Sequence, residues 1–287
     1  MTQRVVGLLG GGLVEAGRPV LHADDLGLTR GDGCFEATRV RTDPAGRQLI
    51  DHLDQHLDRF DRSCAGLDLP PIDRTAWHRL IDAVLAGWQL PGEAMLKLML
   101  SRGRESEPGG AVTGLATLTE MSPLVLRQRQ QGIAVITLGR GYGSTAFTDQ
   151  PWLLGGVKTL SYAVNVAGSR QASRRGADDV IFTSSDGYLL EAPTASLVWL
   201  AGDQLRTTTL AGTGVLASIT GQALFEAAEQ AGYLTGQALI TPDELAVADG
   251  AWLVSSGRGV ARLTSLDGRQ LNADPELSAR ISALAGF

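Results

Sequence analysis

Lys158 lies in the segment PWLLGGVKTLSYAV (151–164), where its neighbours in sequence are apolar or small. Such surroundings remove water from the amine and favour its neutral, nucleophilic form, as a lysine that forms an imine with a carbonyl group requires. The alternative is a lysine at a strand end whose ammonium reaches solvent. The only other lysine, Lys97, is expected mid-strand with Met95 and Met99 on its face. It would need a carboxylate partner if it faces inward, and an edge position is the alternative.

A carboxylate and a small-residue loop offer two further contacts for a charged ligand. Glu191 ends the segment YLLEA (188–192), where burial beside leucines is costly without a cation such as a protonated pyridine nitrogen. An edge-strand glutamate that faces solvent is the alternative. The segment AGTGVLASIT (211–220) precedes a helix, and N–H groups at a helix start bind phosphate, with Ser218 and Thr220 adding hydroxyls. A plain loop is the alternative, because neither a dinucleotide fingerprint nor a Walker motif is complete here.

Composition excludes several other classes of function. The 287 residues carry 25 basic and 31 acidic side chains, and this net charge of −6 argues against a nucleic-acid partner. Two cysteines and four histidines are too few for a disulfide scaffold or a structural zinc site, so we expect no metal. The apolar stretch 5–14 is too short to span a bilayer and lacks a convincing cleavage site. We therefore expect a cytoplasmic protein with no membrane partner.

Helix and strand signals occur in both halves of the chain. A helix after Asp51, its possible N-cap, places five residues on one face: Leu53, His56, Leu57, Phe60 and Cys64. Further helices are expected over residues 75–88, 161–175, 221–231, 241–244 (a capping box) and 275–286. Strands are expected over 34–41, 47–50, 93–101, 114–121 and 132–139, with hairpins over 180–192 and 196–210. The many hairpins favour an α+β fold, with domains at 1–121 and 132–287 and a linker at 122–131.

In their order along the chain, these segments resemble the fold-type IV pyridoxal-phosphate family, which includes branched-chain aminotransferases, D-amino-acid aminotransferases and aminodeoxychorismate lyases. GDGCFEATRV (31–40) resembles the family's GDGxFE(T/G)xR segment, HLDQHLDRF (52–60) its HLxRL helix, and VKTLSY (157–162) its lysine segment. GADDVIFTSSDGYLLEAPTAS (176–196), GVLASIT (214–220) and ADGAWLVSS (248–256) are similar to its glutamate, phosphate-loop and final phosphate segments. The resemblance spans about residues 27–268.

The resemblance implies a two-domain fold with pyridoxal 5′-phosphate between the domains and a role for each matching residue. Lys158 would form the Schiff base and Glu191 would face the pyridine nitrogen. The phosphate would be held by Arg59, Ser218, Ile219, Thr220 and Ser256. Taken alone, an arginine at position 59 is more commonly a solvated helix arginine. Tyr162 could face the cofactor's phenolic oxygen, and a core tyrosine is the alternative.

The same set of residues serves transamination and elimination. GDGCF (31–35), LKLMLSRGR (96–104) and WLLGGVKTLSYAVN (152–165) are most similar to the lyase members, which form 4-aminobenzoate and pyruvate for folate synthesis. In that hypothesis Lys158 removes a ring proton and Thr38 is a candidate hydroxyl, although a threonine facing its strand neighbours is the alternative. Lys97, Arg102 or Arg104 would meet the substrate carboxylates.

Two other possibilities stay open at this point. One is an aminotransferase of branched-chain or D-amino acids. The other is a non-catalytic relative or an amine-binding regulator, against which retention of Lys158, Glu191 and Arg59 argues. The family also implies a homodimer that acts on a small molecule.

Overall fold

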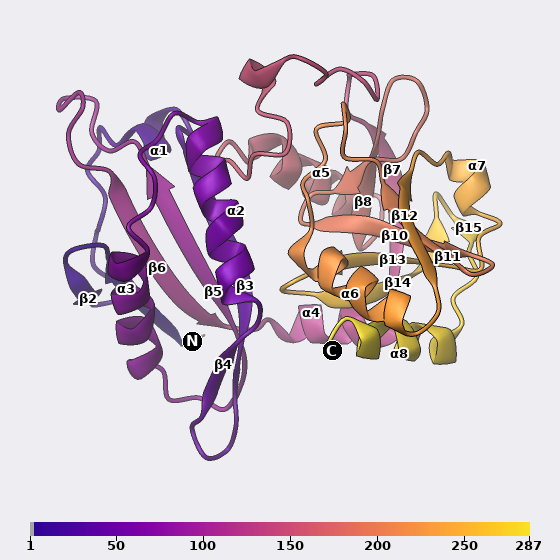
Figure 1. Ribbon diagram of the computed structural model, residues 1–287, viewed down its shortest axis with the longest axis horizontal. Coiled ribbons are helices and arrows are strands. Elements are labelled where there is room, and N and C mark those ends of the chain that lie inside the picture. Colours follow the sequence, from indigo (N-terminus) through magenta and orange to yellow (C-terminus); the bar gives the residue numbers. More distant parts are fainter. Residues whose placement is uncertain (1–2) are drawn as a thin grey trace. The chain divides into compact units, whose positions relative to one another are not determined.

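The structure is a computed structural model that describes residues 3–287, and the chain divides into two compact units (Figure 1). The first unit contains the residues up to Ser122 together with Val157–Tyr162. The second contains Pro123–Gly156 and Ala163–Phe287. This division differs from the prediction in two ways. The expected linker forms helix α4 (Pro123–Gln131) of the second unit, and the lysine segment belongs to the first unit.

The first unit is an antiparallel six-stranded sheet with three helices. Its strand order is β2-β1-β6-β5-β3-β4. The strands are β1 (Arg4–Leu8), β2 (Gly12–Val14), β3 (Gly33–Thr42), β4 (Gln48–Ile50), β5 (Gly92–Ser101) and β6 (Thr113–Glu120). The helices are α1 (Leu26–Thr29), α2 (Leu53–Gly66) and α3 (Arg74–Ala86). Helices α2 and α3 pack on one face of this sheet (Figure 1).

The period of two along β5 separates the two faces of this sheet. Ala94, Leu96, Leu98 and Leu100 are buried in the core with residues of α2 and α3. The alternate residues of β5, Lys97 among them, lie half-buried on the other face. Because Ala37 of β3 pairs with Lys97, the odd-numbered residues of β3 lie on that second face too.

Helix α2 has the predicted apolar face but not the predicted N-cap. His56, Leu57, Phe60 and Cys64 are buried as expected. The helix begins at Leu53 after His52, which has a positive φ of 52° and makes no side-chain cap. The carboxylate of Asp51 instead pairs with Arg39 at 2.5 Å and with Arg41 at 2.9 Å. The carboxylate expected to cap the helix is therefore paired with two guanidinium groups of β3.

The second unit is a mixed sheet with helices of its own. Its strands run in the order β12-β11-β10-β13-β14-β7-β8, with β15 paired to β14 and β9 paired to β10. The bounds are β7 (Ile133–Gly139), β8 (Asp179–Thr183), β9 (Glu191–Ala192), β10 (Ala195–Ala201), β11 (Gln204–Thr208), β12 (Leu234–Ala238), β13 (Gly250–Ser255), β14 (Gly259–Leu266) and β15 (Arg269–Gln270). Besides α4, the helices are a 3-10 turn (Pro151–Leu153), α5 (Ala163–Arg174), α6 (Ile219–Gln230), α7 (Pro242–Leu245) and α8 (Pro275–Leu284). The α+β class is confirmed.

The hairpin expected over residues 180–192 forms next to its turn but does not continue into β9. Strand β8 pairs in parallel with β7, and β9 pairs with β10. Gly187 in the turn has a φ of 93°, Thr183 bridges Leu189, and the N–H of Ser184 donates to the carbonyl of Tyr188 at 2.9 Å. After the turn, the N–H of Leu190 donates to the carbonyl of Phe182 on β8, whereas the N–H of Leu189 donates to the carbonyl of Ile240. This divergence places Glu191 opposite Ser196 on β10.

Candidate active site

The backbone of Lys158 is attached to the edge of β3. Its carbonyl accepts from the N–H of Phe35 at 3.0 Å, and the N–H of Leu160 donates to Gly33 O at 2.8 Å. The N–H of Lys158 donates to the Ser63 hydroxyl of α2 at 3.3 Å. A Cβ on Gly33 would clash with the carbonyl oxygen of Leu100 on β5 and lie 2.7 Å from Leu160 Cδ1, so glycine suits the point where β3 meets both neighbours. Sheet and helix together therefore fix the lysine's position.

The side chain of Lys158 lies against an aromatic ring on the second face of the sheet. Because Cys34 bridges Thr159, Lys158 shares the face of Phe35 rather than that of Cys34. Its Nζ is 4.6 Å from the Phe35 ring centroid, and Lys97 Nζ is 5.6 Å from the same centroid. Tyr162 meets Phe35 edge to face, with centroids 5.4 Å apart. The structure thus brings three predicted residues, Lys97, Lys158 and Tyr162, around one ring.

Arg59 does point inward from α2, where it forms a buried ion pair. Its Nε and Nη2 donate to the two carboxylate oxygens of Glu36, each at 2.7 Å. His56 Nδ1 lies 2.7 Å from the same carboxylate. Glu36 and His56 are 1 % exposed and Arg59 is 7 % exposed. Such a two-point pair fixes the plane of the guanidinium.

The charge state of this cluster follows from its surroundings. Burial would raise the pKa of Glu36, but hydrogen bonds from Arg59 and His56 outweigh it and lower the pKa to about 2. Burial lowers the pKa of His56 despite its contact with Glu36. Glu36 is therefore ionised and His56 is neutral at pH 7. An ionised carboxylate only accepts hydrogen bonds, so His56 carries its proton on Nδ1.

In the second unit, Glu191 is tied to the loop before α6. Its Oε2 accepts from the N–H of Leu216 at 3.2 Å. The Thr208 hydroxyl donates to the carbonyl of Leu190 at 2.7 Å and so holds the preceding peptide. A half-buried carboxylate held in this way can pair with a cationic ring nitrogen.

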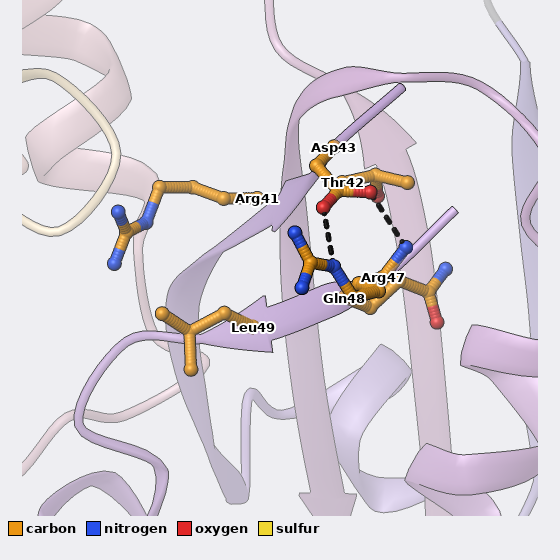
Figure 2. Close-up of a pocket in the computed structure, with 6 residues that line it drawn as sticks. All are labelled: Arg41, Thr42, Asp43, Arg47, Gln48 and Leu49. Carbon is orange, nitrogen blue, oxygen red and sulfur yellow. Dashed lines mark hydrogen bonds and ion pairs between the residues drawn. The ribbon is translucent and has the colours of Figure 1, made fainter. Parts of the chain in front are cut away.

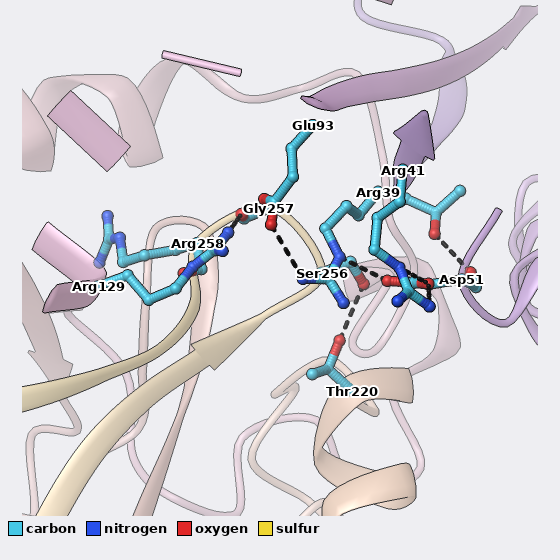
Figure 3. Close-up of polar contacts among 10 residues, drawn as sticks. Arg39, Arg41, Asp51, Glu93, Arg129, Thr220, Ser256, Gly257 and Arg258 are labelled. Carbon is cyan, nitrogen blue, oxygen red and sulfur yellow. Dashed lines mark hydrogen bonds and ion pairs between the residues drawn. The ribbon is translucent and has the colours of Figure 1, made fainter. Parts of the chain in front are cut away.

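The N-terminus of α6 and the turn after β13 bring together four of the predicted phosphate contacts, of which Figure 3 shows Thr220 and Ser256. Ser218 is the N-cap of α6, and its hydroxyl accepts from Gly221 N–H at 3.0 Å. Ile219 and Thr220 are the first two helical residues, whose N–H groups have no acceptor within a helix. The hydroxyls of Thr220 and Ser256 lie 2.9 Å apart. Hydroxyls and N–H groups at the start of a 12-residue helix suit an anion.

Thr38, Arg102 and Arg104, which were expected to contact substrate, each have a partner within the protein. Thr38 faces the α2 side of the sheet, where its buried hydroxyl donates to the carbonyl of Asp51 at 2.6 Å. Arg102 is paired with Asp32 through Nε at 2.7 Å, and it also donates to two carbonyls that follow α2. Arg104 is paired with Asp24 at 3.1 Å and with Glu107 at 2.5 Å. These partners give all three side chains a structural role.

Three other residues of the site were missed in the sequence analysis. Glu36 and His56 were unremarkable as a strand glutamate and an apolar-face histidine, yet with Arg59 they form a buried cluster. Phe35 was not singled out, although both lysine amines contact it. The motif GDGCFE contains Phe35 and Glu36 next to each other, and the alternation along β3 could have suggested that they face opposite ways.

A hollow on the β3–β4 hairpin is not part of this site (Figure 2). Its lining consists of Arg41, Thr42, Asp43, Arg47, Gln48 and Leu49. Its two arginines are paired, Arg41 with Asp51 and Arg47 with Asp43. It lies at the opposite end of β3 from Phe35. Within residues 3–287 no helix is long and apolar enough to cross a membrane, and no group of three or more acidic, cysteine or histidine residues could hold a metal ion.

Comparison with known proteins assigns the family. The family model described as Amino-transferase class IV matches residues 33–266. The chain belongs to this family. A bifunctional aminodeoxychorismate lyase / D-amino acid transaminase of Mycobacterium tuberculosis is 39 % identical over 275 residues, which are 93 % of each chain.

Solved structures of class IV enzymes match over nearly the whole chain. A Mycobacterium tuberculosis aminotransferase in its PLP-bound form has a TM-score of 0.91 and 38 % identity, covering 98 % of each chain. A fold IV transaminase of Curtobacterium pusillum has a TM-score of 0.90 and 39 % identity, covering 99 % of this chain and 100 % of that one. The protein is a fold-type IV enzyme that depends on pyridoxal phosphate (PLP).

The residues present fit this cofactor. An aldehyde requires a primary amine, which Lys158 supplies beside Phe35. A protonated pyridine nitrogen requires a carboxylate such as Glu191. A phosphate requires donors of the kind that meet at Thr220 and Ser256. All three chemical needs are therefore matched in the chain.

Proposed function

We propose that the protein is a 4-amino-4-deoxychorismate lyase, which converts its substrate to 4-aminobenzoate and pyruvate. Bound pyridoxal phosphate would supply an aldehyde that captures the substrate amine and a ring that withdraws electrons. Lys158 would form the resting bond to the aldehyde and, once displaced, accept a proton from the substrate ring carbon. The bond to the enolpyruvyl oxygen then breaks, pyruvate leaves as its enol, and the carbocycle becomes aromatic.

The other residues would hold the cofactor in place. Glu191 would keep a proton on the pyridine nitrogen, which strengthens electron withdrawal. Arg59, Thr220, Ser256 and the N–H groups of Ile219 and Thr220 would bind the phosphate. Ser218 would act through its cap on α6, which orders those N–H groups. Tyr162 would face the phenolic oxygen, since its ring already packs beside Phe35.

The observation that carries the substrate assignment is the position of Lys97. Lys97 pairs with Ala37 of β3, so its amine lies on the same sheet face as Phe35 and Lys158. Both amines lie near the Phe35 ring. Among the three basic candidates Lys97 has neither an ion pair nor a hydrogen bond within residues 3–287, whereas Arg102 and Arg104 are paired. A cation set apart from Lys158 suits a carboxylate remote from the reacting amine. Aminodeoxychorismate has this arrangement, because its ring separates amine and carboxylate.

A second activity, transamination of D-amino acids, is supported by the relatives. The Mycobacterium tuberculosis relative is named for both activities, and the Curtobacterium pusillum structure is described as a transaminase. In transamination Lys158 would accept the proton from the substrate's α-carbon and deliver it to the former aldehyde carbon of the cofactor, with no elimination. For D-glutamate, Lys97 would meet the second carboxylate. A homodimer, which the family implies, can be checked by light scattering.

The assay that separates the two activities supplies aminodeoxychorismate to the holoenzyme without any keto acid. The proposed lyase releases pyruvate and 4-aminobenzoate in equal amounts over many turnovers. A parallel reaction supplies D-alanine with 2-oxoglutarate and measures D-glutamate. Amino transfer without pyruvate release from aminodeoxychorismate would leave only the transaminase.

A further inference from the structure

The turn that carries Ser256 is short, and Ser255 at the end of β13 holds one side of it by accepting from the N–H of Arg258 at 3.2 Å. Ser255 of β13 pairs with Gly259 of β14, so Ser256, Gly257 and Arg258 form the connection. Ser256 presents its hydroxyl to Thr220 from this connection. Three residues without ladder hydrogen bonds of their own can adopt several conformations. The position of the Ser256 hydroxyl therefore depends on what holds this turn.

Arg129 of α4 binds the backbone of the turn (Figure 3). Its Nε donates to Arg258 O at 2.8 Å, and its Nη2 donates to Gly257 O at 3.1 Å. One planar guanidinium that bridges two consecutive carbonyls fixes both peptide groups at once. The Phe287 ring lies 4.8 Å from the Arg129 guanidinium carbon and packs against it.

Gly259 shows how closely these groups pack. A Cβ at this position would lie 2.6 Å from the Phe287 ring and 2.9 Å from Arg129 Nε. Its φ of 76° also favours glycine. Larger side chains would thus push Arg129 away from the turn. Glycine at the first position of β14 therefore leaves room for the contact between Arg129 and the turn.

Arg258 holds the same turn from a different side. Its Nη1 lies 2.7 Å from the carboxylate of Asp179, at the start of β8. Both side chains are largely buried, with 12 % of Arg258 and 4 % of Asp179 exposed. The turn's own arginine is therefore paired with a carboxylate. Arg129 supplies the contacts to the carbonyls of Gly257 and Arg258.

We propose that Arg129 is a positioning residue for the cofactor phosphate. It would not touch the phosphate, but it would hold the Ser256–Arg258 turn so that the Ser256 and Thr220 hydroxyls converge on it. This inference rests on the proposed roles of Ser256 and Thr220. Helix α4, which the sequence predicted to be a linker, would then contribute to cofactor affinity.

The test compares two forms of the cofactor, with and without phosphate. Apoenzyme is titrated with pyridoxal phosphate and, separately, with pyridoxal, and dissociation constants are obtained from quenching of tryptophan fluorescence. Arg129→Gln is expected to weaken pyridoxal phosphate about tenfold, on the scale of one lost charge-assisted contact, and to leave pyridoxal within about twofold. Arg129→Lys, which keeps the charge but not the planar fork, is expected to lie between wild type and Arg129→Gln. Arg127→Gln is the matched control, because Arg127 is exposed on the same helix.

Each outcome decides between distinct explanations. An equal loss of affinity for both compounds in Arg129→Gln would show a general structural role and overturn the inference. Unchanged affinity for both, or full retention in Arg129→Lys, would overturn it too. A wild-type protein that binds pyridoxal phosphate no better than pyridoxal would instead refute the proposed phosphate roles of Ser256 and Thr220. Inorganic phosphate added with pyridoxal should increase the affinity for pyridoxal, and this increase should be larger in wild type than in Arg129→Gln.

Discussion

Lys97 and Lys158, the two lysines of the chain, place their amines against one phenyl ring. Nζ of Lys158 is 4.6 Å and Nζ of Lys97 is 5.6 Å from the centroid of Phe35. A chain that uses arginine for the rest of its basic side chains thus has its primary amines on one sheet face. Only a primary amine can form and exchange an imine. We propose that Lys158 carries that chemistry and that Lys97 binds a substrate carboxylate.

Replacing Lys97 should affect substrate binding rather than chemistry. Lys97→Met keeps the length of the side chain and removes the charge. Because a charge-assisted contact to carboxylate is lost, KM for aminodeoxychorismate should rise about tenfold or more while kcat changes little. Transamination of D-alanine, which has no second carboxylate, should be nearly unaffected. Steady-state kinetics on both substrates measure this.

Arg104→Gln serves as the comparison for that variant. Arg104 is paired with Asp24 and Glu107, so its loss should leave KM for aminodeoxychorismate near the wild-type value. If KM rises with Arg104→Gln and not with Lys97→Met, then Arg104 binds the carboxylate and the proposed role of Lys97 is wrong.

Removing the charge of Glu36 should destabilise the apoenzyme strongly. Glu36→Gln leaves the Arg59 guanidinium buried without its counter-charge, and breaking a buried pair in this way costs about 3–5 kcal/mol. Urea unfolding of the apoenzyme gives the free energy of unfolding. Glu105→Gln breaks an exposed pair with Arg30, and it should cost less than about 1 kcal/mol. Similar losses in the two variants would contradict the buried cluster.

The stability of the apoenzyme should fall in acid in two stages. The pKa of His56 is lowered below its ordinary value of 6.5, so its contribution is present above pH 6.5 and is lost as the pH falls below that value. The pKa of Glu36 is lowered from 4.5 to about 2, so its contribution is lost between those values. Urea midpoints measured from pH 8 to pH 4 follow the first stage and the start of the second.

His56→Asn tests the assignment of the first stage. Asparagine keeps a donor for Glu36 but does not titrate. The variant should lose less stability than wild type between pH 7 and pH 5. An unchanged slope in this range would place the titration on another group.

The hydroxyls of Thr220 and Ser256 should act together in binding phosphate. They lie 2.9 Å apart, and contacting groups are non-additive. Thr220→Val and Ser256→Ala should each weaken pyridoxal phosphate, and the double variant should differ from their sum by about 0.5 kcal/mol or more. Affinity for pyridoxal should stay constant in all three. Strictly additive effects would mean that the two hydroxyls bind separate ligands.

The parts of this site that depend on local sequence were predictable. The apolar period of α2 placed Arg59 beside a buried face, and the small neighbours of Lys158 indicated a special lysine. The order of the motifs along the chain then indicated the family, which the comparisons confirm. Each single motif requires only residues within a few positions of one another.

The pairing of distant charges was not predictable. Arg102 meets Asp32 and Arg104 meets Asp24, each across at least 70 residues, and no local pattern selects among the 31 acidic residues. Thr38 donates to the Asp51 carbonyl because the β3–β4 hairpin brings that carbonyl close. The pairing of β9 with β10 similarly depends on tertiary hydrogen bonds at Leu189 and Leu190. Competition between partners, rather than propensity, decides such contacts.

The most direct test of the central claim is to find which lysine carries the cofactor. Holoenzyme is reduced with sodium borohydride, digested, and mapped by peptide mass spectrometry. We expect a phosphopyridoxyl group on Lys158 in the peptide that contains VKTLSY, and none in Lys158→Ala treated in the same way. The chain offers one other lysine, so the opposing result is equally clear. A label on Lys97, or a stable label in Lys158→Ala, would contradict the assignment.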